Sequence, residues 1–132
     1  AYNYKHLSNG VPDRWQDRFF DHISSISIGA IDEPARTVLL SDAATLNSAG
    51  TGITTTDFLD APTFHRPRFH GRHNGMGNIL WVDGHVTVKR PFFRQSSDRN
   101  SAAQLSVLRQ WNVGDLDEDG NMLTDELFRA TK

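Results

Sequence analysis

Carboxylate side chains recur at alternate positions near the carboxyl end of the chain. Asp115, Asp117 and Asp119 are followed by Gly120, and Glu126 comes six residues after that glycine. A hard divalent cation prefers six to eight oxygen ligands, and carboxylates at alternate positions of one loop can supply several of them. Without a cation these charges would repel one another, so the spacing predicts that a bound positive ion neutralises them.

Residues 115–126 fit the calcium-binding loop of EF-hands, Asp-x-Asp-x-Asp-Gly-x5-Glu. In that pattern Gly120 permits a sharp turn, Asn121 presents its backbone carbonyl, and Glu126 closes the site. Leu123 departs from the pattern because its side chain has no oxygen, so a water or another group must fill that direction. A single loop, with only six residues after Glu126, favours a structural Ca²⁺ site over a switch. The alternative is a solvated acidic turn. The predicted ligands are Asp115, Asp117, Asp119, Asn121 and Glu126.

Four histidines raise the possibility of a different metal site. They are His65, His70, His73 and His85. A zinc hydrolase would need three or four imidazoles converging on one point, and their spacing matches no compact pattern such as His-Glu-x-x-His. The sequence also has no nucleophile elbow, phosphate-binding loop or dinucleotide fingerprint. We therefore expect no catalytic residues and a protein that is not an enzyme, with a metal-dependent hydrolase as the less favoured alternative.

Two apolar runs on either side of Asp83-Gly84 predict a β-hairpin. This dipeptide tolerates the positive φ angles of a two-residue type I′ turn, which would pair Val82 with His85. Paired residues share a face of the sheet. The predicted apolar face consists of Ile79, Trp81, Val86 and Val88.

Other elements follow from the hydrophobic pattern. Ser101 and Gln104 have the spacing of a capping box, which predicts a helix start. The apolar face of that helix would consist of Leu105, Leu108 and Trp111. We also expect a helix beginning at Pro12, a strand within residues 23–31 and a buried strand over residues 35–40. Residues 41–67 are polar, and their length indicates a functional or a mobile loop.

The composition is that of one globular domain. With 132 residues, 37% hydrophobic and 23% charged, the chain can bury a core although it has no cysteine. A net charge of −2 argues against a nucleic-acid partner, which needs a basic stripe. Arg66, Arg68, His70 and Arg72 form only a short basic cluster, which we interpret as part of a solvated loop. No apolar run is long enough to span a membrane.

Around the hairpin the sequence resembles a bacterial family of pilin-like proteins. Nine residues separate His73 from Asp83-Gly84, as in the family's His-X9-Asp-Gly motif. Residues 31–42 are similar to its Pro-x-x-Thr-hydrophobic-x-x-Asp strand, and residues 1–4 to its Ser-Tyr-x-x-Asn start. Members carry a prepilin-type N-terminal cleavage and methylation signal and are related to type II secretion pseudopilins.

The resemblance implies an exported α+β head domain whose antiparallel sheet packs on a long N-terminal helix. It implies a non-catalytic subunit of a filament or secretion system, with pilin-like subunits or secretion-system proteins as partners. The processing site and the hydrophobic N-terminal helix of the family are missing from this sequence. We therefore expect any contact with a membrane to be made only through that missing helix. Calcium near the C-terminal region of the head is a recurrent stabiliser in pseudopilins. On this interpretation Asp83 and Gly84 make the turn and His73 braces it.

We therefore expect an α+β fold in which residues 1–132 form a single pilin-like head domain. An antiparallel sheet would be built around the Asp83-Gly84 hairpin, with short flanking helices and with residues 101–132 as a helix plus calcium-loop appendage. The expected function is that of an extracellular or cell-surface assembly subunit stabilised by Ca²⁺. The alternative is a free extracellular calcium-dependent module that binds carbohydrate or another cell-surface ligand through residues 41–67.

Overall fold

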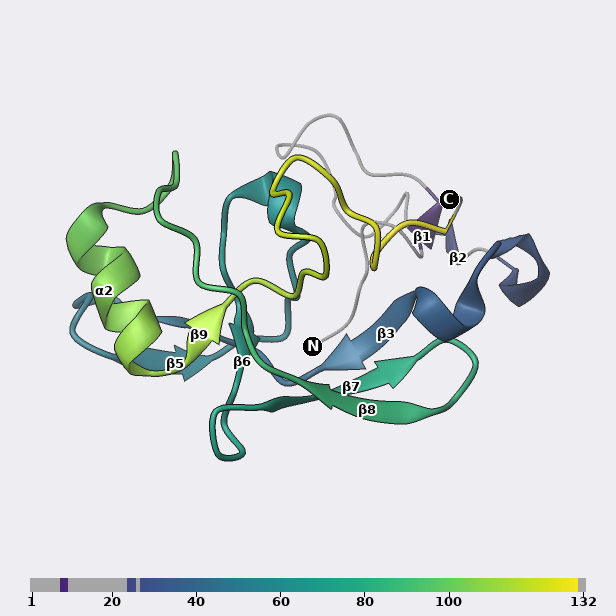
Figure 1. Cartoon of the computed structure of the whole chain (residues 1–132), viewed down its shortest axis with the longest axis horizontal. Helices are drawn as coiled ribbons and strands as arrows, with labels where there is room; N and C mark the ends of the chain where they lie inside the picture. The colour runs from purple at the N-terminus through teal and green to yellow at the C-terminus, as the bar shows by residue number, and fades with distance from the viewer. Residues whose placement is uncertain (1–7, 10–23, 26, 131–132) are drawn as a thin grey trace.

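The computed structural model describes residues 8–9, 24–25 and 27–130 of the chain (Figure 1). Within these residues the fold combines short antiparallel strands with one α-helix, so it is mixed α+β, as expected. No helix in this part of the chain is long and apolar enough to cross a membrane. The helix predicted to begin at Pro12 lies outside the described residues.

The largest sheet has three antiparallel strands in the order β3-β7-β8 and lies along the lower edge of the view in Figure 1. Its strands are β3 (Val38–Ser41), β7 (Gly77–Trp81) and β8 (Val86–Lys89). The central strand, β7, follows the polar stretch 41–67 in the sequence. It pairs with β3, the strand that leads into that stretch.

Three two-stranded pairs and one helix complete the described structure. The pairs are β1 (Ser8–Asn9) with β2 (Ser24–Ser25), β4 (Ala44–Leu46) with β5 (Ile53–Thr55), and β6 (Phe69–His70) with β9 (Val113–Gly114). The α-helix is α2 (Ala102–Gln110), and short 3-10 turns are η1 (Ile28–Ala30), η2 (Pro34–Arg36) and η3 (Pro62–Phe64). The polar stretch 41–67 is thus structured, because it contains the β4–β5 hairpin and η3.

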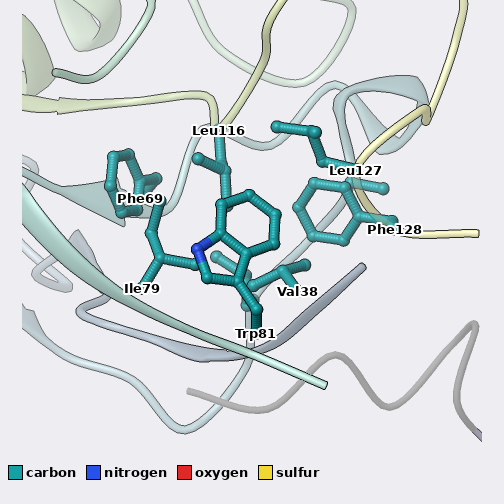
Figure 2. Packing of buried hydrophobic residues seen from close by; sticks show 9 residues of the cluster. Val38, Phe69, Ile79, Trp81, Leu116, Leu127 and Phe128 are labelled. Atoms are coloured by element: carbon teal, nitrogen blue, oxygen red, sulfur yellow. The ribbon is translucent and has the colours of Figure 1, made fainter. Parts of the chain in front are cut away.

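The main core lies against the β3-β7-β8 sheet and combines residues from Val38 to Phe128 (Figure 2). Its labelled residues are Val38, Phe69, Ile79, Trp81, Leu116, Leu127 and Phe128. The C-terminal segment also contacts the edge strand β3, because the Val38 N–H donates to the Leu127 carbonyl at 2.8 Å. Leu127 and Phe128, which directly follow the predicted calcium loop, are buried in this core.

The turn between β7 and β8 differs from the predicted type I′ turn. The Gly84 N–H donates to the Trp81 carbonyl at 2.9 Å, and the Trp81 N–H donates to the His85 carbonyl at 3.0 Å. Gly84 has a φ of 96°, whereas Asp83 is not among the residues with positive φ. This is a three-residue loop that ends in a left-handed glycine, the next most common way to close a hairpin.

The extra loop residue shifts the hairpin register by one, so the predicted pairing is wrong. Ile79 pairs with Thr87, and Leu80 pairs with Val86. Because side chains alternate across a strand, the shift moves Val86 and Val88 to the face opposite Ile79. Ile79 is fully buried, while Val86 and Val88 are 63% and 49% exposed.

A two-residue turn with two positive φ angles occurs at the other end of β7. Asn74 and Gly75 have φ angles of 57° and 80°, and His73 and Met76 exchange both backbone hydrogen bonds across them, at 2.9 and 3.1 Å. These features are typical of the type I′ turn that Asn-Gly favours. The Asn-Gly dipeptide was a sequence signal for this turn.

The capping box before α2 is confirmed. The Ser101 hydroxyl accepts from the Gln104 N–H at 3.2 Å, and the Gln104 side chain accepts from the Ser101 N–H at 2.9 Å. Leu108 is buried and Leu105 packs beside it, but Trp111 is the exposed C-cap.

The two strand predictions before residue 41 are only partly correct. Only Ser24–Ser25 of the range 23–31 is a described strand, because the chain turns at η1, where the Ser27 hydroxyl accepts from the Gly29 N–H. The range 35–40 becomes strand only from Val38, since Pro34 starts η2.

Candidate metal site

Three of the predicted metal ligands lie together in the structure. Asp117, Asp119 and Glu126 each offer one carboxylate oxygen, and these oxygens lie within 4.8 Å of one another. Within the described residues, this is the one group of three or more His, Cys, Asp or Glu side chains close enough to hold a metal ion. We call it the acidic cluster.

Backbone N–H groups of the loop position the aspartates of the acidic cluster. The Gly120 N–H donates to Asp117 Oδ2 at 2.6 Å, and the Asn121 N–H donates to Asp119 Oδ1 at 2.8 Å. Gly120 has a φ of 78°, a backbone angle that residues other than glycine rarely adopt. A glycine at this position of the motif therefore suits the bend of the loop. The sequence places a glycine where the two carboxylates need the chain to turn.

Glu126 closes the cluster from the far end of the loop. Its Oε1 accepts from the Glu118 N–H at 3.0 Å, and its Oε2 accepts from the Thr124 hydroxyl at 3.2 Å. Sequence reasoning did not identify Thr124, although its position two residues before Glu126 brings its hydroxyl beside the carboxylate. These bonds hold Glu126 against the aspartates before any ion arrives.

One oxygen of the cluster lacks a partner. Asp117 Oδ1 is buried and accepts no hydrogen bond in the described structure. Burial raises the pKa of the Asp117 carboxyl to about 6, and the neighbouring charges of Glu126 and Asp119 add to that rise, while the Gly120 N–H opposes it. A buried carboxylate oxygen without a donor is unfavourable, and a cation would satisfy it.

Asp115 does not join the acidic cluster. Both of its carboxylate oxygens accept from the Arg94 guanidinium, at 2.7 Å from Nε and 2.6 Å from Nη2. Both side chains are almost fully buried, and Arg94 Nη2 also donates to the Pro62 carbonyl at 3.0 Å. The structure therefore gives Asp115 a structural ion pair, in place of the predicted first position among the metal ligands.

The Asn121 carbonyl, a further predicted ligand, is occupied within the loop. It accepts from the Thr124 N–H at 3.0 Å and shares the Thr124 hydroxyl, also at 3.0 Å, with Glu126 Oε2. The Asn121 side chain accepts from the Leu123 N–H at 3.1 Å. Asn121 thus shapes the loop in this structure. The oxygens that could bind a metal ion are the side-chain carboxylate oxygens of the acidic cluster.

The loop is not flanked by two helices as in an EF-hand. α2 ends at Gln110, and β9 lies between it and Asp115. Residues 127–130 contain no helix, because Leu127 and Phe128 enter the core. In the sequence, the residues of the acidic cluster therefore lie between two core residues: Leu116 directly precedes Asp117, and Leu127 directly follows Glu126.

The four histidines do not converge on one point. His65 and His85 have separate acidic neighbours, Asp98 and Asp83 respectively, and His85 also stacks on Trp81 with 5.8 Å between ring centroids. His70 Nδ1 is buried and has no hydrogen-bond partner among the described residues, and burial lowers the pKa of its imidazole. No group of three histidines suited to a metal occurs among residues 27–130.

His73 braces a different part of the fold from the predicted Asp83-Gly84 turn. Its Nε2 lies 3.3 Å from Asp42 Oδ2, and the same Asp42 oxygen accepts from the Asn78 N–H at 2.9 Å. The length of β7 separates His73 from Gly84. His73 and Asp42 therefore join the start of β7 to the end of β3.

No family model matches this chain, and neither a curated protein nor a solved structure shows a match to it.

Proposed function

We propose that this chain is a non-catalytic assembly module, similar to the head domains of pilin-like proteins, that is exported from the cell and stabilised by one Ca²⁺ ion. The observation that best supports the assembly role is an exposed apolar surface on the β3-β7-β8 sheet, on the side opposite the core. We call this surface the outer face.

Cross-strand pairing gathers the apolar side chains of the outer face. Leu40 pairs with Leu80, and Leu80 pairs with Val86, so the three form one row across the sheet. Val88 lies two residues further along β8 and shares this face. Leu40 is 41% exposed, and Val86 and Val88 are more exposed still. Contiguous exposed apolar surface of this kind is typical of interaction sites.

A helix is the partner that this surface fits best. A sheet with one apolar face towards the core and a second apolar face towards solvent can bury the second face only under another layer. The resemblance to pilin-like proteins implies that an apolar helix supplies that layer. We propose that the outer face packs against such a helix in a pilin-like assembly.

The acidic cluster supports Ca²⁺ as the stabilising ion. Its donor set consists of carboxylate oxygens from Asp117, Asp119 and Glu126. Oxygen ligands suit Ca²⁺, whose coordination is flexible, whereas Zn²⁺ prefers nitrogen and sulfur ligands. An ion there would tie residue 117 to residue 126. That link would hold Leu116 and Leu127 in the core, which explains how the ion would stabilise the fold.

Photo-cross-linking in native host cells tests the assembly role. A photoreactive phenylalanine analogue replaces Val86 on the outer face or, as a control, Ser106 on the exposed side of α2. Mass spectrometry then identifies the cross-linked peptides. We expect the Val86 position, and not the Ser106 position, to cross-link to the apolar helix of a pilin-like subunit. Equal cross-linking from both positions, or none from Val86, would contradict the proposal.

The alternatives have less support. A carbohydrate-binding module would be favoured by an aromatic-lined hollow in residues 41–67, but two cavities lined by residues of this stretch contain no Phe, Tyr or Trp in their lining. A histidine-based hydrolase would need imidazoles that share a ligand position, and the described histidines have separate surroundings.

A further inference from the structure

A cavity of about 400 Å³ lies where β4, residues 66–68, residues 98–100 and α2 meet. Three arginines contribute to its lining: Arg66, Arg68 and Arg99. The cavity is therefore locally basic, although the chain as a whole carries a net charge of −2. The short basic cluster of the sequence thus has a defined place in the fold.

Two of these guanidinium groups have no acidic partner among the residues that the structure describes. Arg68 is neutralised by Asp60, whose Oδ2 lies 3.2 Å from its Nε. Within the described part of the chain, neither Arg66 nor Arg99 forms an ion pair. Asp98, the acidic residue of the lining, is 88% exposed, and its carboxylate lies 4.0 Å from His65. Among the described residues, Arg66 and Arg99 thus bring two positive charges without a directly paired carboxylate, and Asp98 brings one exposed negative charge to the same lining.

The segments that carry Arg66 and Arg99 are held next to each other. The Ser97 hydroxyl donates to the His65 carbonyl at 2.6 Å and accepts from the Arg99 N–H at 3.1 Å. This one side chain therefore links the residue before Arg66 to Arg99 itself. The Ala44 N–H fixes the third arginine, because it donates to the Arg68 carbonyl at 3.0 Å. A site whose backbone is already in place loses less entropy when it binds.

We propose that this cavity binds a tetrahedral oxyanion, that is, a phosphate or sulfate group, either free or as a monoester on a sugar. Guanidinium groups recognise such anions with paired, charge-assisted hydrogen bonds. Thr45 and Asn100 add neutral hydrogen-bonding groups to the lining. Leu46 and Leu108 give it an apolar part, and the volume exceeds what one inorganic anion fills, which leaves room for the carrier of an ester.

Isothermal titration calorimetry with the full chain tests this assignment. The probes are inorganic phosphate, inorganic sulfate and glucose 6-phosphate, with sodium chloride and glucose as controls at matched ionic strength. We expect at least one oxyanion probe to bind saturably and neither control to bind. If glucose 6-phosphate binds more tightly than phosphate, the ligand of the cavity is a phosphate ester. If the two bind equally, the ligand is the free ion. If no oxyanion binds, the proposal is wrong.

Paired substitutions locate the binding. Arg66→Gln with Arg99→Gln removes the two arginine charges that have no directly paired carboxylate among the described residues, and Arg90→Gln removes an exposed charge outside the cavity. We expect the double variant to bind about tenfold more weakly, or not at all, and Arg90→Gln to bind like the parent. Equal binding by all three proteins would contradict the assignment.

Circular dichroism checks that the double variant folds, and the two single variants replace it if it does not. The outcome is independent of the calcium site, since none of these arginines belongs to the acidic cluster.

Discussion

Arg94 and Asp115 form a buried, two-pronged ion pair in which Nε and Nη2 of the arginine donate to the two carboxylate oxygens, at 2.7 and 2.6 Å. The pair connects the segment after β8 to the start of the acidic loop. Because Arg94 also donates to the Pro62 carbonyl, it joins η3 to the same point. The residue that opens the calcium motif in the sequence therefore anchors the loop to the core.

Asp115→Asn should destabilise the protein without removing the calcium site. The substitution leaves the Arg94 guanidinium buried without its counter-charge, and breaking a buried pair in this way costs about 3–5 kcal/mol. Urea unfolding in the presence of a chelator measures this loss, with Asp119→Asn as an exposed control from the same loop. If Asp115→Asn unfolds like the parent in chelator but loses its calcium response, Asp115 is a ligand and the structural role is wrong.

The chelated protein should lose stability as pH rises from about 4 to 6. The pKa of Asp117 is raised to about 6, so the folded state binds more protons than the unfolded state in this interval. Stability then falls with rising pH, and it levels off above the folded-state pKa. Thermal unfolding at several pH values, compared between the parent and Asp117→Asn, isolates this contribution. A difference between the two proteins that does not change over this interval would contradict the pKa assignment.

Calcium affinity should decrease below about pH 6 for the same reason. Metal ligands must be deprotonated, so Ca²⁺ competes with the proton on Asp117. Calorimetric titration with CaCl₂ at pH 7.5 and at pH 5 measures the change. The same affinity at both pH values would indicate that Asp117 is not a ligand.

Truncation of side chains on the two hairpin faces tests the observed register. Ile79→Ala removes a fully buried side chain and should cost about 2–5 kcal/mol, whereas Val88→Ala on the outer face should cost about 0.5 kcal/mol or less. Urea unfolding of both variants provides the comparison. The predicted type I′ register put both residues on one buried face, so equal losses would favour that register over the observed one.

Sequence reasoning identified features whose signal is local. The capping box of Ser101 and Gln104 was predictable because both partners lie within one helical turn. The acidic cluster was predictable in part for the same reason, since Asp117, Asp119 and Glu126 belong to one short loop. In both cases neighbouring residues decide the local geometry.

Features that depend on distant residues were not predictable. The carboxylate of Asp115 faces Arg94, which lies 21 residues earlier, and the motif alone gives no sign of that partner. The hairpin register was misjudged because Asp83-Gly84 suits both two- and three-residue loops, and because apolar residues occur on both faces. The burial of Phe128 depends on tertiary packing with residues far away in the sequence, which the local pattern around the acidic loop does not reveal.

Thermal unfolding in calcium and in chelator tests most directly the claim that one Ca²⁺ ion at the acidic cluster stabilises the fold. We expect millimolar Ca²⁺ to raise the unfolding midpoint of the parent, because an ion at a hundred times its Kd adds about 2.7 kcal/mol. The rise should disappear in Glu126→Gln and persist in Glu118→Gln, a loop glutamate outside the cluster. Coincident calcium and chelator curves for the parent, or an equal rise in both variants, would contradict the claim.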